Sequence, residues 1–183
     1  MLALFSLVLG GFIYAALLKD HINPSKKSHI SPYPEIKVED LGKRVDDLKR
    51  KYPDLLLTQN RDGWVVGRHK FEGAHYTVWF IAENKEFVAF RIKATQTYSH
   101  LKEKETLKFF GTLFGRPFDN YCKGKSTYAI ESCHYKWWVR DAVSLDVYTR
   151  TKKDQSVVLD AITTDTYLTS KHHKIIRTFL PIQ

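Results

Sequence analysis

Three consecutive segments rich in β-branched and aromatic residues lie in the middle of the chain, and they restrict its fold more than any other feature. They cover residues 64–71, 76–83 and 86–96. Short polar segments at 72–75 and 84–85 separate them. Strand-forming runs joined by turns this short form hairpins. The sequence therefore predicts a three-stranded antiparallel meander.

Helical patterns precede and follow this meander. Apolar residues recur at three- and four-residue steps from Val38 to Tyr52, which places them on one stripe of an amphipathic helix. Pro53 ends that helix, because proline cannot continue the hydrogen-bond ladder. A second helix is expected between Ser99, a suitable N-cap, and Gly115.

The strand pattern returns in the last part of the chain. Residues 135–150 and 155–168 have this composition, and 128–133 can add a short edge strand. The order helix, three strands, helix, two or three strands predicts an α+β domain built on an antiparallel sheet. Two arrangements fit this order: one continuous sheet with both helices on a single face, or two similar halves.

An uncharged apolar run of 17 residues, from Leu2 to Leu18, opens the chain. As a helix it reaches about 25 Å, which is short but within the range of membrane spans. The run lacks the cationic start and the clear cleavage site of a signal peptide. These features favour an N-terminal transmembrane helix over the alternatives, a cleaved signal or a buried helix of the fold.

The chain has 183 residues, of which 43% are apolar, enough for one ordinary core. The predicted organisation is a transmembrane anchor or signal at 1–18, a linker at 19–37, the α+β domain at 38–170 and a basic tail at 171–183. The linker is expected because its segment contains three prolines and no apolar periodicity.

Cys122 and Cys133 enclose a short polar stretch that can close as a loop. A disulfide there would persist in a periplasm or another oxidising compartment and contribute about 3 kcal/mol; two reduced thiols are the alternative. Lys19, Lys26 and Lys27 follow the apolar run, and the positive-inside rule would place the domain in the cytosol. We expect a membrane-anchored domain on the oxidising side, with its orientation open.

The hairpin around 84–85 provides a candidate contact surface. If residues whose numbers sum to 169 face each other, one side of the hairpin is apolar enough to be the core side. The other side carries more apolar area than a face left to water usually holds. Either an element of the chain itself or a partner protein should cover it. The predicted partner-binding residues are Tyr76, Val78, Phe80, Phe87, Arg91 and Lys93 of this hairpin, together with Trp137 and Trp138.

Trp137 and Trp138 form the second aromatic feature. Neighbouring strand residues point to opposite faces, so one indole should be buried and the other should face the surface. The surface indole is a candidate anchor for a protein, a glycan or a lipid headgroup. The alternative is an indole half-buried under a loop.

A turn centred on Lys153 would oppose Asp146 and Asp160 across the C-terminal hairpin. Paired carboxylates can divide proton-donor and proton-acceptor work, so this pair, or His134, gives the alternative of a small hydrolase or transferase. A register shift of two residues would separate the acids. The sequence contains no zinc, nucleophile-elbow or phosphate-loop motif, so we expect no enzyme activity, no metal and no cofactor.

The formal net charge is +9, and the basic tail contributes Lys171, Lys174 and Arg177 as a candidate surface for anionic lipid or another polyanion. In the second predicted helix, acidic residues interleave with the lysines. This mixed pattern argues against a nucleic-acid-binding stripe.

These features together predict a membrane-tethered, non-catalytic interaction module. It would act as a subunit or assembly factor of an envelope complex, or as an inhibitor of an envelope enzyme. Its expected partners are proteins of a membrane complex and the membrane itself through residues 2–18.

Overall fold

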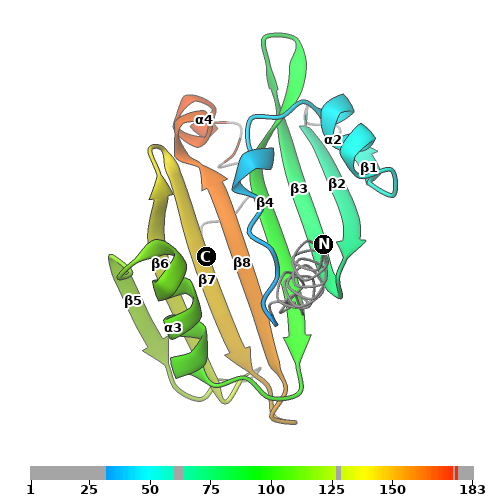
Figure 1. Cartoon of the computed structure of the whole chain (residues 1–183). Coiled ribbons are helices and arrows are strands. Elements are labelled where there is room, and N and C mark those ends of the chain that lie inside the picture. The colour runs from blue at the N-terminus through cyan, green and yellow to red at the C-terminus, as the bar shows by residue number, and fades with distance from the viewer. Residues whose placement is uncertain (1–31, 60–63, 127–128, 175, 177–183) are drawn as a thin grey trace, which may run out of the picture. The chain divides into compact units, whose positions relative to one another are not determined.

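One antiparallel sheet of eight strands organises the described part of the chain (Figure 1). The structure is a computed structural model, and it describes residues 32–59, 64–126, 129–174 and 176. The strand order is β1-β2-β3-β4-β8-β7-β6-β5. β1 and β5 therefore form the two edges, and β4 and β8 lie at the centre.

The helices and strands divide into two halves that follow one another along the chain. The first half contains the 3-10 helix η1 (Val38–Asp40), α2 (Val45–Lys51), β1 (Leu56–Gln59), β2 (Trp64–Phe71), β3 (Ala74–Glu83) and β4 (Glu86–Tyr98). The second half contains α3 (Glu103–Phe114), β5 (Asp119–Lys123), β6 (Glu131–Arg140), β7 (Val143–Thr151), β8 (Val157–Asp165) and α4 (Thr166–Lys171).

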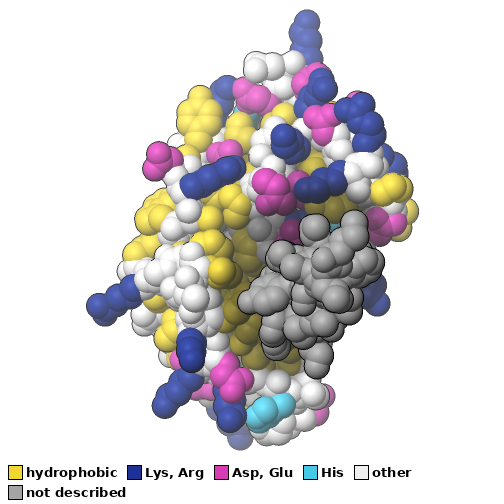
Figure 2. Space-filling view, in the orientation of Figure 1, with side chains coloured by type: hydrophobic (Ala, Val, Ile, Leu, Met, Phe, Trp, Pro, Cys, Tyr) yellow, Lys and Arg dark blue, Asp and Glu magenta, His cyan; other side chains and the backbone are white. Residues whose placement is uncertain are grey.

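α2 and α3 pack on the same face of the sheet, which we call the helix face (Figure 1). Leu48 of α2 lies in a buried cluster with Phe80, and Phe110 of α3 lies in a second cluster with Trp137. Figure 2 looks onto this face, where hydrophobic side chains show in the middle of the view and charged side chains lie mainly above and below them. α4 packs on the opposite face, which we call the far face, where Leu168 belongs to a buried cluster with Ile81 and Phe90.

The predicted fold class, an α+β domain with a transmembrane helix, is wrong. The part of the chain that the structure describes is mostly antiparallel sheet with few helices, and none of those helices is both long enough and apolar enough to cross a membrane. The predicted anchor at 2–18 lies outside the described residues. The membrane and single-pass predictions therefore have no support.

The predicted order also contained too few strands. Every side chain of β1 and of β5 is exposed, so neither strand has the alternation of buried and exposed residues that identifies a strand from sequence. The segment 135–150 contains a turn at residues 141–142, where Ala142 has a φ of 56°. This turn divides the segment between β6 and β7.

The first predicted helix, from Val38 to Tyr52, is interrupted. η1 ends at Asp40, and Gly42 then adopts a φ of 78°, which residues other than glycine rarely reach. The α-helix proper begins only at Val45. The predicted apolar stripe nevertheless faces the core, because Leu41 and Leu48 are both buried in the cluster on the helix face.

A β-bulge changes the predicted faces of the first hairpin. The pairing follows the expected register from Glu83 to Phe80, but it shifts between Trp79 and Phe80, so that Trp79 faces Arg91. A shift of one residue moves each following side chain to the other face. Arg91 and Lys93 consequently lie on the far face, opposite to Tyr76.

Aromatic rings surround Lys37, the last residue of the predicted linker. Its Nζ lies 4.6 Å from the ring centroid of Phe71, 4.9 Å from that of Tyr52 and 5.2 Å from that of Tyr76. The cation–π contacts with Phe71 and Tyr76 fasten the segment before η1 to the sheet, and an ion pair with Glu35 of the same segment neutralises Lys37. The compact unit accordingly begins at Tyr33, within the range predicted as linker.

We expect Gly67→Ala to lower the free energy of unfolding by about 1–3 kcal/mol, the usual range for overpacking a core. A Cβ at residue 67 would lie 2.8 Å from Leu55 Cδ1 and 3.2 Å from a ring carbon of Phe80.

Gly111 in α3 is the matched control, because a Cβ there would meet nothing within 4 Å. Gly111→Ala should raise stability by about 0.5–1 kcal/mol through its better helix propensity. Urea unfolding followed by circular dichroism measures both changes, and equal effects would contradict the packing of Leu55 against β2.

Candidate functional site

The residues predicted to bind a partner on the first hairpin lie on both faces of the sheet. Four of them pack in or against the core beneath α2: Tyr76, Val78, Phe80 and Phe87. The first three are at most 3% exposed, because the chain's own elements cover them. Arg91 and Lys93, on the far face, are partly exposed.

The two adjacent tryptophans point to opposite faces, as the sequence predicts. Trp137 is 1% exposed, and its Nε1 donates a hydrogen bond of 2.9 Å to the carbonyl oxygen of Gly115. Trp138 lies on the far face and is 55% exposed. Of the predicted partner-binding residues, Trp138 is the one whose ring is largely open to another molecule.

Trp138 belongs to an exposed aromatic group beside β5, which we call the β5 patch: Phe118, Tyr121 and Trp138. The rings of Phe118 and Trp138 stack with centroids 5.3 Å apart and planes 12° apart. Phe118 is 52% exposed and Tyr121 is 47% exposed. Aromatic area of this size on a surface is typical of an interaction site.

Basic side chains border the β5 patch. Lys136 Nζ lies 5.8 Å from the ring centroid of Phe118, and Lys123 Nζ lies 5.5 Å from that of Tyr121. Arg116, two residues before Phe118, is exposed. Asp119 is the single acid within β5, so the border of the patch is mainly positive.

β5 is an edge strand. It pairs with β6 on one side, and no other strand of the described residues pairs with its outer side. An edge strand carries backbone N–H and C=O groups that another strand can bind. The β5 patch therefore lies directly beside a backbone that can accept a further strand.

A buried polar group supports Tyr121 from behind. His134 Nε2 lies 2.8 Å from Asp146 Oδ1, and because an ionised carboxylate only accepts, Nε2 donates this hydrogen bond. The His134 ring stacks on Tyr148 with centroids 4.3 Å apart and meets Tyr121 edge-on at 5.2 Å. Burial and then the charge of Asp146 raise the pKa of Tyr148. The group fixes the orientation of the exposed ring.

The predicted opposition of Asp146 and Asp160 is wrong. The register of β7 and β8 pairs Asp146 with Ile162 and Tyr148 with Asp160, a shift of two residues from the predicted pairing. The turn is longer than expected, because its first flanking pair is Thr151 with Val157.

Each of the two carboxylates has its own partners. Asp160 accepts hydrogen bonds of 2.6 Å from Arg150 and 2.6 Å from Thr95, while Asp146 accepts from His134. The structure therefore does not bring the two acids together as a catalytic pair.

The structure describes two of the three basic residues predicted to bind anionic lipid or another polyanion, Lys171 and Lys174. Lys171 forms an ion pair with Glu83, and His172 lies 2.6 Å from the other carboxylate oxygen of Glu83. The hydrogen bonds from Lys171 and then from His172 lower the pKa of the Glu83 carboxyl group. Lys174 is exposed, and Arg177 lies outside the described residues. At least part of the tail's charge is thus matched within the chain.

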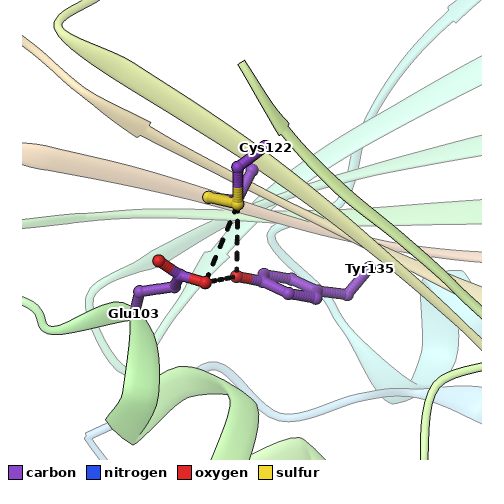
Figure 3. The surroundings of a disulfide bond; sticks show 4 residues. Glu103, Cys122 and Tyr135 are labelled. Carbon is purple, nitrogen blue, oxygen red and sulfur yellow. Dashed lines mark hydrogen bonds between the residues drawn. A yellow bond between two sulfur atoms is a disulfide. The ribbon is translucent and has the colours of Figure 1, made fainter. Parts of the chain in front are cut away.

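The predicted disulfide joins Cys122 and Cys133, which are directly opposite residues of β5 and β6. Its sulfur atoms lie on the helix face, beside Glu103 of α3 and Tyr135 of β6 (Figure 3). Tyr135 Oη donates a hydrogen bond of 2.5 Å to Glu103 Oε1. Burial and then this bond raise the pKa of Tyr135. The sequence carries no local signal for Glu103, which only the packing of α3 brings here.

No protein-family model matches this chain, and the comparison with curated proteins finds none that is similar.

We expect the double substitution Cys122→Ser with Cys133→Ser to lower the free energy of unfolding by up to about 3 kcal/mol, the value for opening a loop of this length. β5 buries none of its own side chains, so the amides of β5 should also lose protection from hydrogen exchange. Amides of β4 and β8 serve as the internal control. Unchanged exchange in β5 would mean that the disulfide does not hold this edge in place.

Proposed function

We propose that this chain is a non-catalytic protein-interaction module that binds an extended segment of a partner protein along β5. The observation that carries the proposal is the exposed, stacked pair of Phe118 and Trp138 directly beside β5, whose outer edge pairs with no other strand in the part of the chain that the structure describes. The module would serve as a subunit or assembly factor of a complex, or as an inhibitor of an enzyme.

Binding along β5 would combine two sources of affinity. A partner strand added to an edge forms backbone hydrogen bonds, and side chains near that edge then select the partner. Tryptophan and tyrosine are enriched among the residues that dominate interface energies. Because Phe118 already stacks on Trp138, little side-chain freedom remains to be lost when a partner binds.

The charge around the β5 patch favours an acidic partner segment. Lys123 and Lys136 lie beside the rings, although Lys136 Nζ is also 3.9 Å from Asp146 Oδ1. Arg116, two residues before Phe118, is exposed, and the whole chain carries a formal net charge of +9. Opposite charges across an interface accelerate association and disfavour wrong partners. The partner segment we propose is therefore extended, acidic and apolar on the side that meets the rings.

The disulfide supports an oxidising compartment, such as a periplasm, as the place of this interaction, because reducing compartments keep most thiols free. The alternative functions have less support. For a hydrolase or transferase, the two aspartates are not directly opposite each other, and the other candidate, His134, is hydrogen-bonded to Asp146 and stacked on Tyr148. For a polyanion binder, Lys171 is paired with Glu83, although Lys174 is exposed.

A photoreactive amino acid at position 119 tests the docking edge in the native host. We expect ultraviolet light to produce an adduct of one defined mass, because residue 119 lies in β5. The same amino acid at position 108, exposed on α3, should give none. Phe118→Ala with Trp138→Ala should abolish the adduct and change the free energy of unfolding by less than about 1 kcal/mol, because both rings are exposed.

An adduct that survives this double substitution would contradict the proposal. So would recovery of the wild-type chain at native expression as a monomer without an adduct.

Charge reversal tests the acidic character of the partner. Arg116→Glu with Lys123→Glu should reduce adduct formation from position 119 by about tenfold, which corresponds to about 1.4 kcal/mol. Arg68→Glu with Lys70→Glu is the matched control, because it changes the net charge equally on exposed residues of β2. An equal loss with both pairs would mean that net charge alone governs binding.

A further inference from the structure

Three side chains able to bind a metal meet between α3 and the β5 edge: Glu103, Cys122 and Cys133. One potential ligand atom from each lies within 4.8 Å of the others. They come from three different elements, α3, β5 and β6. The proposed docking function uses none of the three as a contact.

The polar groups beside the disulfide can interact better with a reduced cysteine than with a disulfide sulfur. Glu103 Oε1 lies 3.7 Å from Cys122 Sγ, and Tyr135 Oη lies 3.8 Å from it, both aimed at the sulfur (Figure 3). A sulfur in a disulfide carries no hydrogen, so it has nothing to donate to the carboxylate. A thiol can donate to it, and a metal held by the sulfur can bind it directly.

We propose that reduction of the Cys122–Cys133 disulfide turns this cluster into a binding site for one thiophilic divalent cation, of which zinc is the representative. Two thiolates and one carboxylate are ligands that zinc accepts, and water would complete four-coordination. Space for that water exists because Cys122 and Glu103 are exposed, whereas Cys133 is buried.

The backbone already holds the two cysteines at a suitable separation. They are directly opposite across β5 and β6, with Cα atoms 4.1 Å apart. Zinc–sulfur bonds are about 2.3 Å long, so a single ion can reach both thiolates after modest side-chain rotation. Glu103 is held beside them by its hydrogen bond from Tyr135.

The chemical steps balance with a dithiol as the reductant. The dithiol gives two electrons and two protons: its own sulfurs join in a disulfide, the Cys122–Cys133 bond breaks, and each cysteine sulfur becomes a thiol. Zinc then binds both sulfurs, and two protons pass to solvent. The carboxylate of Glu103 binds without a proton change.

Such an ion would link β5 to β6 where the disulfide otherwise does. The cluster lies on the helix face of β5, whereas Tyr121 and the rest of the β5 patch lie on the far face. An experiment that rules out the metal site therefore does not contradict the proposed docking function. An experiment that rules out docking likewise does not contradict the metal site.

Cobalt titration of the full chain tests the proposal. The chain is reduced with dithiothreitol and freed of it by anaerobic gel filtration. We expect one Co²⁺ per chain, with a sulfur-to-cobalt charge-transfer band and the visible bands of tetrahedral cobalt, all removed by stoichiometric Zn²⁺. The oxidised chain should give none of these bands.

Substitutions show whether the folded cluster binds the ion. Cys122→Ser and Cys133→Ser should each remove the charge-transfer band or reduce it strongly. Glu103→Gln keeps both cysteines and should weaken Zn²⁺ binding about tenfold, while Glu105→Gln, exposed on the same helix, should leave it unchanged. The proposal is overturned if the reduced chain shows no band, or if Glu103→Gln binds Zn²⁺ as tightly as the wild type.

Discussion

The antiparallel pairing of β4 with β8 is the interaction on which the rest of the sheet depends. It runs from Arg91 to Tyr98 on β4 and is the one ladder of the described residues that joins the two four-stranded halves. It also joins their cores, because Ala94 belongs to the cluster beneath α2 and its cross-strand partner Ala161 to the cluster beneath α3. The position of β5 follows from this pairing through β7 and β6.

Local features of the fold could be predicted from the sequence, and features set by distant contacts could not. The hairpin turn was predictable because two polar residues, Asn84 and Lys85, separate two strand-forming runs. In the structure both adopt positive φ, 50° and 68°. The bulge was not predictable, since no residue type demands one at Phe90 of β4, the residue left out between the pairs Trp79–Arg91 and Phe80–Ala89. β1 and β5 escaped prediction because all their side chains are exposed. The true turn length beyond Thr151 moved Asp160 away from Asp146.

The same distinction applies to the candidate site. Strand alternation predicted that one of the two adjacent tryptophans faces the surface, without saying which one, and the cysteine pair was predictable from its spacing along the chain. Phe118 and Tyr121 were missed because they lie at an edge strand without an apolar pattern. Glu103 was missed because only the packing of α3 over β6 brings it to the disulfide. Tyr76 and Phe80 looked available for a partner because the sequence alone left open which element covers them.

The two faces of β5 thus differ. On the helix face, Cys122 forms the disulfide beside Glu103 of α3, and on the far face lie the exposed aromatic rings. Its docking role is tested most directly by hydrogen exchange of the chain alone and within its native complex. The amides of Asp119–Lys123 should exchange more slowly in the complex, while those of Leu56–Gln59 at the other edge of the sheet should not change. Slower exchange at the β1 edge, with β5 unchanged, would place the partner elsewhere and contradict this role.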